Sequence, residues 1–262
     1  MGVPLTFRLE LTAEQQRQIL EQTGQTLTSL PYESSALAVR IPFGGITLDV
    51  PRGVFVPTDS TERLLEAGLE AAAQWREPTI VDVGTGCGAV ALAAARALPA
   101  AMVFATDISK PALHAARKNR TRLGLGNVRF AQGSLLRPLP RRLHGRVAVI
   151  FANVPYVPPH MSNALASAFP VGTAIGLGPD GLGLVRELAD AARAFLAPGG
   201  SLVLQLADFQ WPVISEELTR LGYSAPGLST RVHPGPVAGR LVWTRGSGSV
   251  DSSADLRSPS SH

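Results

Sequence analysis

The chain has 262 residues and a formal net charge of +4, and 45% of its residues are hydrophobic, 17% charged and 6% aromatic. Its single cysteine excludes an internal disulfide and a four-thiolate zinc site, and its five histidines lie too far apart for a local metal motif. The length suits one large α/β domain, and the apolar share predicts that the chain folds. We expect neither a membrane segment nor a secretory signal, and hence a cytoplasmic protein.

The N-terminal part of the sequence predicts two small elements before a longer helix. Thr12, followed by Glu14 and Gln15, indicates a capped amphipathic helix in a short segment over residues 1–35. Residues 36–56 contain apolar runs that are broken by Gly44-Gly45 and by 51–53, which predicts a β-hairpin. A helix is expected over 60–75.

From residue 79 onward, strands and helices are predicted to alternate. The expected strands are 79–83, 102–106, 128–131, 147–152, 201–206 and 240–244, and the expected helices are 90–98, 109–123, 181–196 and 211–221. The strands are continuous apolar runs, which is typical of a mostly parallel sheet with helices on both faces. Such sheets bind ligands at the carboxyl ends of their strands. Residues 246–262 are rich in Gly, Ser and Asp without apolar spacing, which predicts a disordered tail.

A glycine-rich turn follows the first of these strands. It reads Asp82-Val83-Gly84-Thr85-Gly86-Cys87-Gly88-Ala89, and its glycines permit positive φ and let a ligand lie against bare backbone. Asp107 follows the next strand, where a carboxylate can hold both ribose hydroxyls of an adenosine-containing cofactor. Gly84, Gly86 and Ala89 also satisfy the dinucleotide fingerprint, so a nicotinamide-dependent oxidoreductase stays open at this point. A tight turn without any ligand is the third alternative.

A second motif, Asn153-Val154-Pro155-Tyr156, follows the strand over 147–152. With this motif the sequence resembles the class I S-adenosylmethionine-dependent methyltransferases, which place Asn/Asp-Pro-Pro-Tyr/Phe at this strand end when they methylate a planar nitrogen. More closely, it resembles the protein glutamine N-methyltransferases of the HemK/PrmC type. Residues 54–62, 180–182, 198–200 and Gln210 match further landmarks of that family in the same order, so the resemblance covers most of residues 45–245.

This resemblance implies a fold, a cofactor and roles for individual residues. The implied fold is a class I methyltransferase (Rossmann-like) domain over residues 57–245, with a doubly wound, mostly parallel seven-stranded sheet. The implied cofactor is S-adenosylmethionine, and the contacts carried over from the family are Thr61, Asp82, Gly84, Thr85, Gly86, Cys87, Gly88, Asp107, Ile108, Ser134, Leu135 and Asn153. By the same resemblance, the Asn153 side-chain oxygen and the Val154 carbonyl accept the two N–H bonds of an acceptor amide. Pro155 biases Val154 toward extended backbone, and Tyr156 packs on the amide plane.

The sequence departs from the family pattern at several positions. Val154 replaces the family's first proline but keeps the carbonyl group. Ser134 stands where the family has an acidic residue that accepts from the adenine amino group, and Leu135 replaces a residue near the adenine. Gln205 stands where members often have Glu, and 58–60 differ from the family's Arg-Pro-Glu. About 35 residues precede the predicted hairpin, too few for the helical bundle that contacts the protein substrate in the family's release-factor enzymes.

The methyl acceptor stays open between two classes. A glutamine side-chain amide in a protein is the leading expectation, and a small-molecule amine or amide is the alternative. A nucleobase amine and nucleic acid in general are disfavoured, because the basic segments 117–122 and 137–146 lack interleaved aromatic residues. Cys87 is expected to be a small buried filler, since no His or Arg lies near it in sequence to lower its pKa. The sequence indicates no oligomeric state.

Overall fold

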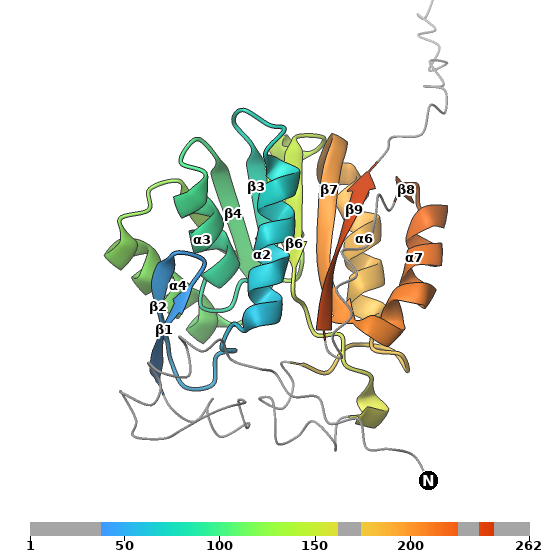
Figure 1. Ribbon diagram of the computed structural model, residues 1–262, viewed down its shortest axis with the longest axis horizontal. Coiled ribbons are helices and arrows are strands. Elements are labelled where there is room, and N and C mark those ends of the chain that lie inside the picture. Colours follow the sequence, from blue (N-terminus) through green and yellow to red (C-terminus); the bar gives the residue numbers. More distant parts are fainter. Residues whose placement is uncertain (1–37, 162–173, 225–235, 244–262) are drawn as a thin grey trace, which may run out of the picture.

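The computed structural model describes residues 38–161, 174–224 and the backbone of 236–243 (Figure 1). The helix expected within 1–35 and the tail expected over 246–262 lie outside these residues. Within the described ranges, no helix combines the length and the apolar character that crossing a bilayer requires.

A single large sheet organises the chain. Its strands are β3 (Thr79–Val83), β4 (Met102–Asp107), β5 (Val128–Gln132), β6 (Val147–Ala152), β7 (Leu196–Ala207), β8 (Tyr223–Ser224) and β9 (Pro236–Trp243). Their spatial order is β5-β4-β3-β6-β7-β9-β8, in which β3 to β7 run parallel and β9 runs antiparallel to β7 and β8. The winding direction changes between β3 and β6, and doubly wound sheets bind their ligands at such a switch point.

Helices cover both faces of this sheet (Figure 1). They are α2 (Asp59–Ala72), α3 (Ala89–Ala97), α4 (Lys110–Leu123), α6 (Gly183–Phe195) and α7 (Trp211–Arg220). Residues of α2, α3 and α4 share one apolar cluster, and those of α6 and α7 share a second. All of β6 is buried, with Val149 and Phe151 in the first cluster and Ile150 and Ala152 in the second. The predicted doubly wound, mostly parallel sheet is therefore confirmed.

The prediction was wrong at the junction of α6 and β7. The helix expected over 181–196 spans Gly183–Phe195, and the strand expected from 201 begins at Leu196. Leu196 pairs with Val147 and Ser201 with Val149, so a register irregularity accommodates Pro198-Gly199-Gly200 within the strand.

The last strands also differ from the prediction. β9 begins at Pro236 rather than 240, because it pairs with β7 from Ser201 to Ala207. The sequence did not predict β8, since two residues are too short to carry a periodic pattern.

The predicted hairpin is confirmed as β1 (Val39–Phe43) paired with β2 (Ile46–Val50). It packs against α3 and α4 in the first apolar cluster. On α4, the Asn119 carboxamide exchanges hydrogen bonds of 2.9 Å with the backbone of Asp49 and also donates to the Cys87 carbonyl at 3.1 Å. This buried side chain therefore ties the hairpin to the glycine-rich turn, and so positions the loop that follows β2.

Gly68 lies where α2 crosses β6. A Cβ added at Gly68 would lie 1.8 Å from Cε1 of Phe151, a buried ring with no room to move. We therefore expect Gly68→Ala to lower the free energy of unfolding by about 2 kcal/mol, despite the better helix propensity of alanine.

Urea denaturation measures this change. Gly126→Ala is the matched control, because a Cβ there meets no atom within 4 Å. It should leave the free energy of unfolding within about 0.5 kcal/mol of the parent value or raise it slightly. Equal stability of the two variants would contradict the close packing of α2 on β6.

Candidate active site

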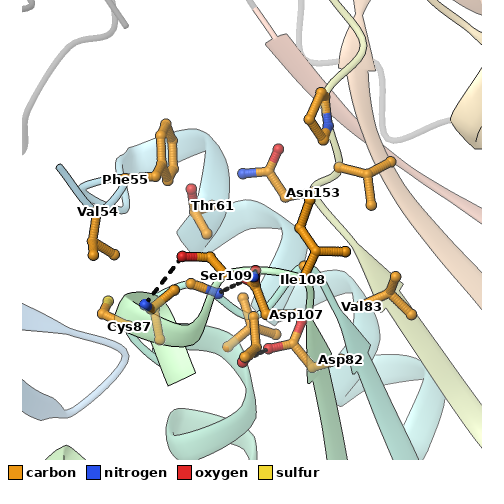
Figure 2. Close-up of a pocket in the computed structure, with 18 of the residues that line it drawn as sticks. Val54, Phe55, Thr61, Asp82, Val83, Cys87, Asp107, Ile108, Ser109 and Asn153 are labelled. Atoms are coloured by element: carbon orange, nitrogen blue, oxygen red, sulfur yellow. Dashed lines mark hydrogen bonds between the residues drawn. The ribbon is translucent and has the colours of Figure 1, made fainter. Parts of the chain in front are cut away.

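A cavity of about 290 Å³ opens at the carboxyl ends of β3, β4 and β6. The predicted site residues that line it are Thr61, Asp82, Gly84, Thr85, Gly86, Cys87, Asp107, Ile108, Ser134, Leu135, Asn153, Val154, Pro155 and Tyr156. Figure 2 shows Phe55 and Thr61 on one side of this space and Asp82 and Asp107 on the other. Residues far apart in the sequence thus meet at the switch point of the sheet.

Gly88 is the one predicted site residue that does not line this cavity. It precedes α3 with a φ of 88°. A Cβ there would lie 2.9 Å from Leu92 and 3.1 Å from Ala116, so its missing side chain makes room for helix packing. Gly88 therefore allows α3 and α4 to pack closely next to the glycine-rich turn.

The backbone of the glycine-rich turn extends the pairing of β3 with β4. The N–H groups of Gly84 and Thr85 donate to the Thr106 carbonyl at 2.9 and 3.0 Å. Gly84 and Gly86 have φ values of 71° and 58°, the left-handed region that glycine adopts without strain. A Cβ at Gly84 would lie 3.5 Å from Cγ1 of Val154, so bare backbone here faces the second motif.

The buried Asp82 carboxylate stabilises the glycine-rich turn through hydrogen bonds. Its Oδ2 atom accepts hydrogen bonds from the Thr85 hydroxyl at 2.6 Å and from the Ala91 N–H at 3.1 Å. Burial raises the pKa of Asp82 to about 6, while these two hydrogen bonds act in the opposite direction. The carboxyl group therefore connects the turn to the first residues of α3.

Asp107 presents its carboxylate at the end of β4. Its Oδ2 atom accepts from the Gly86 N–H at 2.9 Å, and its Oδ1 atom accepts from the Ser109 N–H at 2.8 Å. A carboxylate has about four lone-pair sites, so two remain for a ligand. The neighbouring Ile108 side chain is 72% exposed and lines the cavity, which provides an apolar surface beside the carboxylate.

Leu135 adopts an unusual backbone conformation beside Ser134. Its φ is 49°, the only positive value outside glycine in the described residues. The Thr106 hydroxyl donates to the Leu135 carbonyl at 2.8 Å, which holds this conformation. Both Ser134 and Leu135 line the cavity.

Cys87 lies buried in the glycine-rich turn, and burial raises the pKa of its thiol to about 12. The thiolate is the reactive form, so we expect less than about 1% reaction with a thiol reagent in native protein after minutes at pH 8.

Absorbance with Ellman's reagent measures this, because Cys87 is the only cysteine of the chain. Full reaction should follow only after unfolding in urea. Rapid reaction of the native protein would contradict the filler role.

The second motif forms a loop directly after β6. Figure 2 shows the Asn153 amide group pointing toward the side of the cavity that Phe55 and Thr61 form. In the part of the chain that the structure describes, this amide has no hydrogen-bond partner, which leaves it available to a ligand. Burial raises the pKa of Tyr156 to about 12, and its hydroxyl accepts from Gln205 Nε2 at 3.4 Å.

Gln210 holds the backbone of this loop. Its Nε2 atom donates to the carbonyls of Tyr156 at 2.7 Å and Asp180 at 2.9 Å, and its Oε1 atom accepts from the Ala207 N–H at 3.2 Å. Gly181, with a φ of 78°, allows this contact, since a Cβ there would lie 2.2 Å from the Tyr156 oxygen. Gln210 thus connects the backbone at Asp180 to the backbone of the second motif through hydrogen bonds.

Sequence reasoning missed several lining residues. They are Gly53, Val54, Phe55, Pro57, Val83, Ala89, Val90, Ser109, Ala112, Gly133, Val157, Ala174, Leu184 and Gln205. Residues 53–57 belong to the loop between the hairpin and α2. Its similarity to a family loop over 54–62 was the signal from which these residues could have been predicted.

The residues that line the cavity fit S-adenosylmethionine by their chemistry. Gly84 and Gly86 have no side chains, so a ligand can approach their backbone closely. Asp107 has lone pairs free to accept hydrogen bonds from ribose hydroxyls, and Ile108 provides an apolar surface for a base. Its volume lies near the lower end of the range of about 300 to 1,000 Å³ for small-molecule sites.

Comparisons with known proteins agree with this site. A family profile described as "Methyltransferase domain" matches residues 80–172. The chain is 38% identical over 203 residues to a release factor glutamine methyltransferase of Deinococcus radiodurans. The aligned region covers 74% of this chain and 70% of that protein. It is 37% identical over 183 residues to a release factor glutamine methyltransferase of Moorella thermoacetica, and the aligned region covers 69% of this chain and 64% of that protein.

A solved structure shares the fold. The ribosomal protein L11 methylase of Lactobacillus delbrueckii subsp. bulgaricus superposes with a TM-score of 0.56 at 22% identity, covering 75% of this chain and 84% of that one. The chain spans about two thirds of the length of the curated relatives it matches.

These similarities favour the methyltransferase interpretation of the glycine-rich turn over the nicotinamide interpretation. Identity of 38% extends over both motifs and most of the sheet, and one relative is covered over more than two thirds of its length. The chain belongs to the release factor glutamine methyltransferase family and is an S-adenosylmethionine-dependent methyltransferase.

Proposed function

We propose that this chain transfers a methyl group to the side-chain amide nitrogen of a glutamine in a protein. The observation that supports this most directly is one cavity lined both by the glycine-rich turn with Asp107 and by the loop from Asn153 to Tyr156. Two curated relatives named above are release factor glutamine methyltransferases. We also propose that residues 57–245 form the catalytic unit and that it acts in the cytoplasm.

Residues at the ends of β3 and β4 would hold the cofactor. Bound S-adenosylmethionine supplies a methyl group on a positively charged sulfur, which is strongly electrophilic. The free lone pairs of Asp107 would accept hydrogen bonds from the ribose hydroxyls, and Ile108 and Leu135 would provide apolar contacts to the base. Ser134 offers a hydroxyl to the adenine edge where the family pattern has an acidic residue.

Residues after β6 would hold the acceptor amide. An amide nitrogen is a poor nucleophile because its lone pair is delocalised, so catalysis depends on alignment and exclusion of water. The Asn153 side-chain oxygen and the Val154 carbonyl accept the two N–H bonds, and the Tyr156 ring packs on the amide plane. These contacts aim the nitrogen toward the side of the cavity on which Gly84 lies.

A direct test uses the full chain, S-adenosylmethionine labelled in its methyl group, and peptides that span each glutamine of bacterial release factors. The expected result is the gain of one methyl group on a glutamine side chain, located by fragment mass spectrometry. Peptides with asparagine in place of that glutamine serve as the control and should stay unlabelled. Label that enters only small molecules of a fractionated extract, with every glutamine peptide unmodified, would contradict the proposal.

A further inference from the structure

Asn119 on α4 is a buried side chain that lies next to the cofactor cavity but does not line it. Its Oδ1 atom accepts from the Asp49 N–H at 2.9 Å. Its Nδ2 atom donates to the carbonyls of Asp49 at 2.9 Å and Cys87 at 3.1 Å. Rotating this amide by half a turn would place donor against donor and acceptor against acceptor, so the surrounding protein fixes its orientation.

The Cys87 carbonyl depends on this donor. In an α-helix, a carbonyl accepts from the N–H four residues later, which is Ala91 for Cys87. The Ala91 N–H donates instead to Asp82 Oδ2 at 3.1 Å, because Cys87 lies in the turn before α3 begins. A buried carbonyl without a donor costs free energy comparable with a lost hydrogen bond. Asn119 supplies the missing donor and so belongs to the support of the glycine-rich turn.

Asp49 is the corresponding contact on the hairpin side. It lies two residues before Pro51, whose ring fixes φ and whose carbonyl accepts from the Val54 N–H at 3.2 Å in a tight turn. The loop over 53–57 follows at once, and Gly53, Val54, Phe55 and Pro57 in it line the cavity. This connection is short and restricted, so the position of Asp49 determines where the loop lies.

The two contacts of Asn119 therefore lead to two walls of one cavity. Figure 2 shows Val54 and Phe55 on the loop and Cys87 on the glycine-rich turn. We infer that Asn119 is a positioning residue for the cofactor, which fixes the spacing of these two walls and thereby sets the affinity for S-adenosylmethionine without touching it. A site whose walls are fixed in advance loses less entropy on binding and releases its ligand more slowly. This inference does not depend on the identity of the methyl acceptor.

The experiment measures the Kd of S-adenosylmethionine by calorimetry in the full-length protein and in three variants. Asn119→Ala should raise the Kd about tenfold, because both walls lose their shared contact. Asn127→Ala is the control matched for stability, since Asn127 Nδ2 also donates to two carbonyls, at 3.2 and 3.1 Å, remote from the cavity. It should leave the Kd within about twofold, although it also lowers the free energy of unfolding.

Arg122→Ala separates attachment of the hairpin from the link to the turn. Arg122 forms an ion pair with Asp49 at 3.1 Å, and 35% of its side chain is exposed, so this contact contributes little. Among the described residues, Arg122 makes no hydrogen bond to the glycine-rich turn. It also donates to Asn119 Oδ1 at 3.2 Å, but that oxygen keeps its bond from the Asp49 N–H in the variant. The Kd of Arg122→Ala should therefore stay within about twofold.

A second readout needs only the wild-type chain. If the contact at Asn119 strengthens cofactor binding tenfold, bound cofactor must stabilise the contact by the same factor. Exchange of the Asp49 N–H, followed by NMR, should then slow about tenfold on saturation with S-adenosylmethionine. The comparison is made where this amide exchanges faster than the Val103 N–H of the sheet, and hence by local opening.

Three results would overturn the inference. The first is a Kd in Asn119→Ala that stays within about twofold of the parent value or rises no more than in Asn127→Ala. The second is an equal rise in Arg122→Ala, which would mean that attachment of the hairpin alone matters. The third is exchange of the Asp49 N–H that the cofactor leaves unchanged, and this result decides the question even if Asn119→Ala fails to fold.

Discussion

Asn153→Ala is expected to lower kcat for methyl transfer by at least about 100-fold and to leave the Kd for S-adenosylmethionine within about twofold. The variant removes the oxygen that holds one N–H bond of the acceptor amide, so the nitrogen loses its alignment with the methyl donor. Misplacement by about 1 Å or loss of one oriented polar contact typically costs this much in rate. Cofactor affinity is retained because Asp107 and the glycine-rich turn are unchanged.

Single-turnover kinetics with saturating cofactor measure the first effect, and calorimetry measures the second. Asn127→Ala is the matched control, because it deletes the same amide where Asn127 Nδ2 donates to the carbonyls of Ala95 and Ala101, remote from the cavity. It should lower stability but leave kcat within about twofold. Equal losses of kcat and cofactor affinity in Asn153→Ala would show that the two roles are assigned wrongly.

The sheet and the two motifs could be predicted because their signals are local. β3, β4 and β6 are rich in apolar residues, and both faces of such strands are covered in parallel sheets. The glycine-rich turn and the loop from Asn153 to Tyr156 each follow a strand in sequence. Since the carboxyl ends of parallel strands share one edge, the position of each segment in the sequence already predicted that they meet.

Contacts that depend on side chains distant in sequence could not be predicted. Asn119 joins Asp49 and Cys87 across 70 and 32 residues, and no pattern around Asn119 distinguishes it from a surface residue of α4. The hydrogen bond from Gln205 to Tyr156 spans 49 residues. Proline and glycine at 198–200 normally end regular structure, so only the pairing with β6 reveals that β7 begins before them.

The second large expected effect concerns Asp107, the carboxylate at the end of β4. Asp107→Ala should raise the Kd for S-adenosylmethionine at least about 30-fold, because hydrogen bonds to a charged group each contribute about 1.5–3 kcal/mol. The same change removes the acceptor for the N–H groups of Gly86 and Ser109, so the glycine-rich turn loses its hydrogen bond to the Asp107 side chain. At saturating cofactor, kcat should stay within about threefold, because the loop from Asn153 to Tyr156 is unchanged.

Asp107→Asn separates charge from shape. It keeps one carbonyl acceptor and the size of the side chain, so its Kd should fall between those of the parent and of Asp107→Ala. Calorimetry measures each Kd. Asp190→Ala is the control, since that carboxylate pairs with Arg193 on α6 and 69% of its side chain is accessible. It should bind the cofactor with unchanged affinity. A normal Kd in Asp107→Ala together with a large fall in kcat would contradict the ribose role and would place Asp107 with the acceptor instead.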